Sequence, residues 1–78
     1  MYEENKFDLA LAKFNQVIKK QSDNAFAYYY RGLIFDEQKK YKPAVDDYNK
    51  FISVYKKDDE YSQYIKARVE ELKPFVGG

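Results

Sequence analysis

The amino-acid sequence predicts an all-α fold of about four helices, arranged as antiparallel helix-turn-helix repeats. Three observations support this class. A helical segment that begins near residue 6 recurs 34 residues later, the apolar residues follow helical spacing, and polar breaks with helix-capping residues separate the segments. A chain of this length allows one domain, over residues 1–78, with a small core. Because it has no cysteine or histidine, disulfides and the usual zinc sites are absent, so packing or a partner must supply the stability.

The first predicted helix spans residues 6–20. Its apolar residues follow the spacing of one helix face, and they are Phe7, Ala10, Leu11, Phe14, Val17 and Ile18. The pattern returns 34 residues later, where the matching pairs are Phe7 with Tyr41, Ala10 with Ala44, Leu11 with Val45, Phe14 with Tyr48 and Val17 with Phe51. The chain therefore contains two copies of one amphipathic helix.

A helix hairpin is predicted over residues 25–55. Its first helix is entered through Ser22, Asp23 or Asn24, each of which can cap a first turn, and is expected to stop near Lys39. The second helix is expected to start close to Pro43, because proline is tolerated in a first turn. A break of two or three residues makes these helices antiparallel neighbours.

A last helix is predicted over residues 59–73, after a polar loop. Asp58 or Asp59 is the expected cap, and Pro74 ends the helix before a tail over residues 74–78. The chain is thus expected to hold three helices that follow from the repeat and a fourth at its C-terminal end.

The hairpin resembles the tetratricopeptide repeat, in which an aromatic residue, Leu-Gly and Tyr on one helix meet Ala and Phe on the next. The residues that carry the resemblance are Tyr28, Arg31, Gly32, Phe35, Tyr41, Ala44, Tyr48 and Phe51. It implies one full repeat at residues 25–58, the second helix of a preceding repeat at 6–24, and a C-terminal cap helix at 59–73. The small Gly32 and Ala44 suit a close helix crossing.

The sequence departs from the family pattern at several positions. Arg31 replaces the usual Leu, so its guanidinium must reach solvent or find a carboxylate at the helix pair. Ser22 and Lys56 replace the usual closing Pro, and Lys66 occupies the position of Gly32 in the last helix. That last helix keeps part of the pattern through Tyr64, Ala67 and Val69. The first helix of the first repeat is nearly absent.

Charge and hydropathy argue against nucleic-acid and membrane partners. Fourteen Lys and Arg residues oppose thirteen Asp and Glu residues, which leaves a net charge of +1 and no strong field to attract polyanions. The longest uncharged apolar stretch, Ala25 to Tyr30, is too short to span a bilayer, and residues 1–8 do not resemble a signal segment. We therefore expect no nucleic-acid binding, no membrane insertion and a cytoplasmic location.

Catalytic chemistry has few candidate residues. Without His, Cys or Thr, the hydroxyl nucleophiles beside Tyr are Ser22, Ser53 and Ser62, and no triad can form. Asp46 and Asp47 are adjacent on a helix and do not face each other, so we expect them to be solvated. No calcium loop or glycine-rich phosphate loop is present. The sequence thus predicts no enzyme, no catalytic residue, no metal and no cofactor.

A second apolar stripe marks the candidate site. Phe26, Tyr29, Tyr30 and Leu33 recur at helical spacing on the side of their helix away from the repeat-type core. The resemblance implies that this stripe lines a concave groove that receives an extended peptide or a partner helix. The alternative is that it packs against the neighbouring helices, 7–20 and 60–73. The predicted partner-binding residues are Phe26, Tyr29, Tyr30, Leu33, Glu37 and Tyr64.

The residue types at these positions limit the classes of partner that fit the groove. Family members that clamp acidic chaperone tails use Lys, Arg and Asn there, and this chain does not. An apolar or aromatic segment with basic flanks fits better. Its expected charge partners lie at the rim of the groove and are Asp36, Glu37, Glu70 and Glu71.

Self-association is the alternative function. About one and a half repeats and a cap are fewer than such arrays normally need. Either this chain is a piece of a longer array, or two copies complete each other as a homodimer or by exchanging helices. In the second case the contact residues are Phe7, Leu11 and Phe14.

Overall fold

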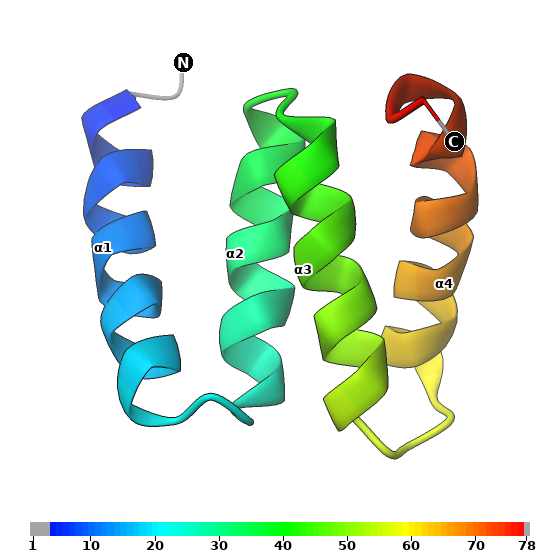
Figure 1. Ribbon diagram of the computed structural model, residues 1–78, viewed down its shortest axis with the longest axis horizontal. Coiled ribbons are helices and arrows are strands. Elements are labelled where there is room, and N and C mark those ends of the chain that lie inside the picture. Colours follow the sequence, from blue (N-terminus) through cyan, green and yellow to red (C-terminus); the bar gives the residue numbers. More distant parts are fainter. Residues whose placement is uncertain (1–3, 78) are drawn as a thin grey trace.

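The computed structural model describes residues 4–77 and shows four α-helices followed by a short 3₁₀ turn. They are α1 (Glu4–Lys20), α2 (Ala25–Glu37), α3 (Tyr41–Val54), α4 (Glu60–Leu72) and η1 (Lys73–Phe75). The helices lie side by side in chain order and alternate in direction (Figure 1). No strand occurs within residues 4–77. The predicted all-α fold of about four helices is confirmed.

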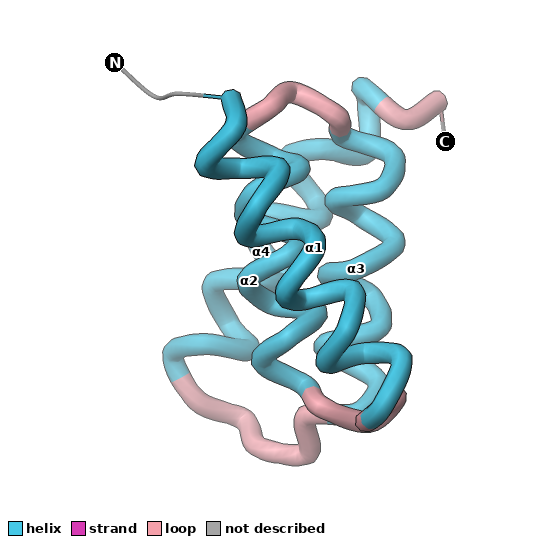
Figure 2. Tube along the Cα trace, turned by 90° about the vertical axis from the view of Figure 1, so that its left-hand side faces the viewer, coloured by secondary structure: helices cyan, strands magenta, loops and turns pink. Residues whose placement is uncertain are grey.

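The arrangement is a row of helices. Seen from the side of α1, this helix lies in front of the others and the connecting loops gather at the two ends (Figure 2). α1 begins two residues before the predicted start, and α4 ends one residue before the predicted end. Residues 1–3 of the predicted domain and Gly78 of the predicted tail lie outside the described residues.

Two helices begin at side-chain caps. The Asn24 side-chain oxygen accepts a hydrogen bond from the Ala27 N–H at 3.1 Å. The Asp59 carboxylate accepts from the backbone N–H groups of Tyr61 and Ser62, at 3.0 and 3.3 Å. The Ser62 hydroxyl in turn accepts from the Asp59 N–H at 2.9 Å, which completes a capping box. Of the caps that the sequence offered, the chain uses Asn24 and Asp59.

The turn between α2 and α3 is closed by main-chain hydrogen bonds. The Lys40 N–H donates to the Phe35 carbonyl at 2.8 Å, and the Lys39 N–H donates to the Asp36 carbonyl at 2.9 Å. Lys39 has φ 62°, the left-handed conformation that this motif requires and that glycine usually supplies. α2 therefore ends at Glu37, two residues before the expected stop.

The core lies between α2, α3 and α4. Its buried residues are Tyr28, Ala44, Val45, Tyr48, Phe51, Ile65, Val69 and Leu72. Gly32 lies against α3 with no room for a side chain, because a Cβ atom there would lie 2.7 Å from the Tyr48 ring and 3.3 Å from the Asp47 Cβ atom. The predicted close crossing therefore depends on the absence of a side chain at this position.

The face that α4 turns to the core differs from the register that the sequence suggested. Ile65 and Leu72 are buried together with Val69, whereas Tyr64 and Ala67 are exposed. Among the described helices α4 packs mainly against α3, so one narrow stripe is enough to cover the end of the core. Val69 of this stripe is predicted from the sequence, whereas Ile65 and Leu72 are not.

Two ion pairs tie the helices together. Arg31 holds Asp47 with two hydrogen bonds, both of 2.7 Å, and donates a third to Asn15 at 2.8 Å. The expectation that Arg31 finds a carboxylate is met. The expectation that Asp47 is solvated is wrong, because it is 4% exposed. Its partner lies on another helix, so adjacency to Asp46 did not decide its environment.

The second ion pair joins α2 to α4. Arg68 donates two hydrogen bonds of 2.8 Å to the Asp36 carboxylate, which also accepts the Tyr48 hydroxyl at 2.8 Å. These contacts hold the pKa of Asp36 below its usual value, chiefly through the Arg68 hydrogen bonds. Asp36 is thus an internal partner of Arg68 and Tyr48, and it is not the rim charge that the sequence suggested.

Candidate functional site

Aromatic rings from α2, α3 and α4 and the loop after α3 form one contiguous cluster. Phe26 lies at its centre, with ring centroids 5.4 Å from Tyr55 and 5.5 Å from Tyr61. Tyr29 contacts Phe51 at 5.3 Å and Tyr61 at 5.7 Å. We call these five residues the aromatic cluster. Edge-to-face and tilted contacts of this kind stabilise beyond the area that they bury, so the cluster holds the first half of α2 against α3 and α4.

Hydrogen bonding and burial raise the pKa values of two phenols of this cluster, Tyr55 and Tyr29. The Tyr55 hydroxyl donates to Asp59 at 2.5 Å, which raises the pKa of Tyr55 to about 12 and lowers the pKa of Asp59. Burial raises the pKa of Tyr29, and the nearby Tyr30, Tyr64 and Tyr61 add to the effect. Both phenols therefore stay neutral at physiological pH and can donate hydrogen bonds.

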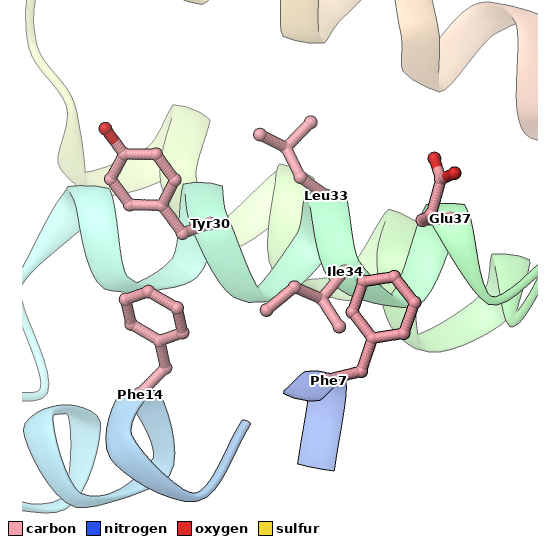
Figure 3. A pocket seen from close by; sticks show the side chains of 6 residues that line it. All are labelled: Phe7, Phe14, Tyr30, Leu33, Ile34 and Glu37. Carbon is pink, nitrogen blue, oxygen red and sulfur yellow. The ribbon is translucent and has the colours of Figure 1, made fainter. Parts of the chain in front are cut away.

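An apolar groove opens between α1 and α2. Its volume is about 300 Å³, and it is lined by Phe7, Phe14, Tyr30, Leu33, Ile34 and Glu37. Phe7 and Phe14 reach from α1 toward α2, while Tyr30, Leu33 and Glu37 leave α2 on a common side (Figure 3). We call this site the α1–α2 groove. It offers a continuous apolar floor with an exposed carboxylate, that of Glu37, at one end.

A stacked ring pair shapes this groove. The rings of Phe14 and Tyr30 lie 5.7 Å apart with 20° between their planes. Tyr30 remains 45% exposed despite this contact. A ring that is held on one face and open to solvent elsewhere is a pre-oriented apolar surface for a ligand.

The structure divides the six predicted partner-binding residues among three places. Tyr30, Leu33 and Glu37 line the α1–α2 groove, and Phe26 and Tyr29 belong to the aromatic cluster. The sixth, on α4, is Tyr64, which is 53% exposed. Phe26 keeps 37% of its surface exposed, so part of the cluster remains accessible.

Two of the three residues predicted for self-association reach the same groove. Phe7 and Phe14 line it, whereas Leu11 is half-buried outside the lining. The peptide-binding and self-association hypotheses therefore concern one surface. The sequence analysis missed Ile34, which lies in the groove beside these rings.

The predicted rim charges have different environments. Glu70 pairs with Lys73 at 2.6 Å, and Glu71 pairs with Arg68 at 3.3 Å. Glu37 is exposed and lines the α1–α2 groove, which makes it the acid best placed for a basic residue of a partner. Sequence reasoning missed Arg68, whose partner lies 32 residues away on another helix.

A second hollow lies between α3 and α4. Its volume is about 420 Å³, and its lining mixes apolar and charged side chains: Val45, Asn49, Ile52, Lys66, Val69, Glu70 and Lys73. Within residues 4–77, no three His, Cys, Asp or Glu side chains gather as a metal site would require. None of the helices described is long and apolar enough to cross a membrane.

Comparison with known families finds a match over α2, α3 and the loop that follows. A sequence model of the tetratricopeptide repeat matches residues 26–58, which confirms the resemblance over this segment. No curated protein and no solved structure matches the chain. Tetratricopeptide repeats are typically non-enzymatic protein-interaction modules.

Proposed function

We propose that this chain, whose residues 26–58 form a tetratricopeptide repeat, is a non-catalytic module that binds an apolar or aromatic segment of a partner protein. The binding site is the α1–α2 groove, extended across α2 toward Tyr64. One observation carries the proposal: five apolar side chains and one exposed carboxylate line a single groove on the surface of a packed helix pair.

The groove has the properties of a pre-formed binding site. Its residues stand on helices, and α2 is fixed by Gly32 at the α3 crossing and by the aromatic cluster. A rigid wall lowers the ordering cost of binding. Tyr30 adds a large apolar area, few rotatable bonds and a hydroxyl, which is the combination most often found at binding hot spots.

The charge of the groove indicates how a segment is oriented. Glu37 stands at the C-terminal end of α2, and the other five lining residues are uncharged. A ligand with an apolar centre and a basic residue beside Glu37 would match this pattern. Lys and Arg flanks on the ligand are therefore part of the proposal.

The test is a peptide-library selection against the 78-residue chain, followed by titration of the selected peptide against two aromatic variants. Tyr30→Ala removes a groove ring that is 45% exposed. Phe75→Ala removes an exposed ring on η1, outside both the groove lining and the aromatic cluster. We expect Tyr30→Ala to weaken binding about tenfold or more and Phe75→Ala to change it much less. Equal affinities of both folded variants and the parent chain would contradict the groove as the binding site.

A second copy of the chain is the competing occupant, since the groove contains Phe7 and Phe14. Under that alternative the protein would be a homodimer in solution and Phe14→Asp would dissociate it. A monomer that binds the selected peptide supports the interaction module.

A further inference from the structure

Equivalent positions of α1 and α3 differ in burial. On α3, Ala44, Val45, Asp47, Tyr48 and Phe51 are all buried. Their equivalents 34 residues earlier, Ala10, Leu11, Lys13, Phe14 and Val17, are all half-buried or exposed. α3 packs against both α2 and α4, whereas among the described helices α1 packs mainly against α2 (Figure 1). The face of α1 that corresponds to the α2-covered face of α3 therefore lacks an equivalent helix within residues 4–77.

α2 shows what such a covering helix looks like. Gly32 lets the backbone approach the Tyr48 ring, and Arg31 pairs with Asp47 beside it. Four residues beyond the glycine, Asp36 accepts the Tyr48 hydroxyl. The glycine, the residue before it and the residue four positions after it therefore contact the Tyr48 ring, the Asp47 carboxylate and the Tyr48 hydroxyl of α3, respectively.

We infer that α1 accepts an amphipathic helix of a partner protein in the way that α3 accepts α2. The inference rests on the proposed function, because this helix would lie over the α1–α2 groove, and it narrows the ligand from an apolar segment to a helix of stated sequence. The helix carries a small residue opposite Phe14, an acidic residue immediately before it, and an apolar residue four positions after it.

A small residue is needed in the partner helix because the face of α1 around Phe14 repeats the shape of the α3 face that α2 covers. Ala10 repeats Ala44, and Phe14 replaces Tyr48 with a ring of nearly the same size. The corresponding crossing between α2 and α3 leaves no room for a Cβ atom at Gly32. A large side chain at the equivalent position of the partner would hold the two helices apart.

The acidic and apolar residues follow from the differences between α1 and α3. Lys13 is exposed where α3 has Asp47, so an arginine like Arg31 would meet a like charge and an acid would meet an opposite one. Phe14 has no hydroxyl, and Ile34 stands where α4 has Arg68. A carboxylate like Asp36 would therefore be buried there without a partner.

Neither α2 nor α4 of a second copy supplies such a helix. In α4 the position of Gly32 is taken by Lys66, and the position of Arg31 by Ile65, which is fully buried in its own chain. α2 is already buried against α3 through Tyr28 and Gly32. Because neither helix of a second copy fits, the occupant that we propose is a helix of a different protein.

Three synthetic peptides test the inference, all based on residues 24–38. The matched peptide carries Arg31→Glu and Asp36→Leu, the second is unmodified, and the third adds Gly32→Leu to the matched one. Binding to the 78-residue chain is followed by fluorescence anisotropy and helix formation by circular dichroism. We expect the matched peptide to bind and to become helical. The other two should bind about tenfold more weakly or worse.

The protein variant Lys13→Glu is the complementary test. Lys13 is exposed, so the substitution keeps the fold. It should lower the affinity for the matched peptide several-fold and raise the affinity for a peptide that carries only Asp36→Leu and therefore keeps Arg31. A Phe14→Ala variant that remains helical should no longer bind the matched peptide.

Two results would overturn the inference: no binding of the matched peptide, or equal affinity for the Gly32→Leu peptide. Neither result contradicts the proposed function. That proposal fails separately if library-selected peptides bind the Tyr30→Ala variant as tightly as the parent chain. Binding that tolerates Gly32→Leu but depends on Tyr30 would mean that the groove takes an apolar segment without the stated helix.

Discussion

α1 and α3 carry the same apolar pattern and have different environments. Tyr48 of α3 is fully buried between α2 and α4, while its equivalent Phe14 of α1 is half-buried at the edge of a groove. A repeat helix gains its burial from its neighbours, because each helix can bury one stripe against each adjacent helix. The comparison shows that the identical pattern produces core in one place and a candidate binding surface in the other.

The polar contacts of the two helices also differ, because the Tyr48 hydroxyl has a fixed hydrogen-bond partner and Phe14 has no hydroxyl. The hydroxyl of Tyr48 joins the Asp36 and Arg68 pair inside the structure. Around Phe14 the corresponding residues are apolar or exposed, which removes the requirement for a fixed polar partner. The surface at α1 can therefore exchange solvent for a ligand without breaking an internal hydrogen bond.

The largest expected effect separates the two helices directly. Tyr48→Ala removes a fully buried ring and should lower the free energy of unfolding by about 3 to 5 kcal/mol. Phe14→Ala removes the equivalent, half-buried ring and should cost roughly 1 kcal/mol. Urea unfolding followed by circular dichroism measures both. Equal costs would show that α1 is covered as well as α3.

A smaller effect on stability is expected from replacing Asp36, whose carboxylate binds the Tyr48 hydroxyl of α3. Phe14 of α1 has no hydroxyl and makes no equivalent contact. Asp36→Asn weakens two charged hydrogen bonds from Arg68 and should cost about 1.5 to 3 kcal/mol at pH 7. Because the pKa of Asp36 is lowered in the folded state, its contribution is present above about pH 4 and is lost as the pH falls below that value.

Unfolding experiments between pH 7 and pH 2 check this expectation. The parent chain should lose more stability below pH 4 than Asp36→Asn does. Asp46→Asn, at an exposed position of α3, is the control and should follow the parent. An acid profile of Asp36→Asn that matches the parent would show that another group governs acid stability.

The smallest effect concerns the turn that sets α2 against α3. Lys39 adopts φ 62°, so Lys39→Gly should raise the free energy of unfolding by about 1 kcal/mol. Lys40→Gly, at a neighbouring residue with φ −94°, should bring no comparable gain. Thermal unfolding compares the two variants, and a destabilising Lys39→Gly would contradict the account of this turn.

The helices and their starts were largely predictable because they depend on local chemistry. The 34-residue offset located α1 and α3, and the capping residue types limited the start of α2 to three positions, of which Asn24 is used. The stop of α2 was less predictable. A lysine at a left-handed position carries no sequence signal, because that conformation is normally assigned to glycine.

The side-chain pairings across helices were not predictable from one sequence. The sequence predicts that Arg31 reaches solvent or finds a carboxylate, but helix periodicity alone can neither decide between these nor choose Asp47 from the acids nearby. Arg68 and Asp36 lie 32 residues apart, and their contact depends on how α4 settles on α3. The aromatic stripe was found, yet its division between the aromatic cluster and the α1–α2 groove depends on the positions of α1 and α4.

The measurement that tests the central claim most directly is the solution mass across a protein concentration series, with helicity recorded at each concentration. The claim is that the chain folds by itself and leaves the Phe14 face of α1 open to a different protein. It predicts a monomer of about 9.4 kDa with constant helicity over the whole series. A dimer that loses helicity on dilution would contradict it, because a second copy would then occupy that face and complete the fold.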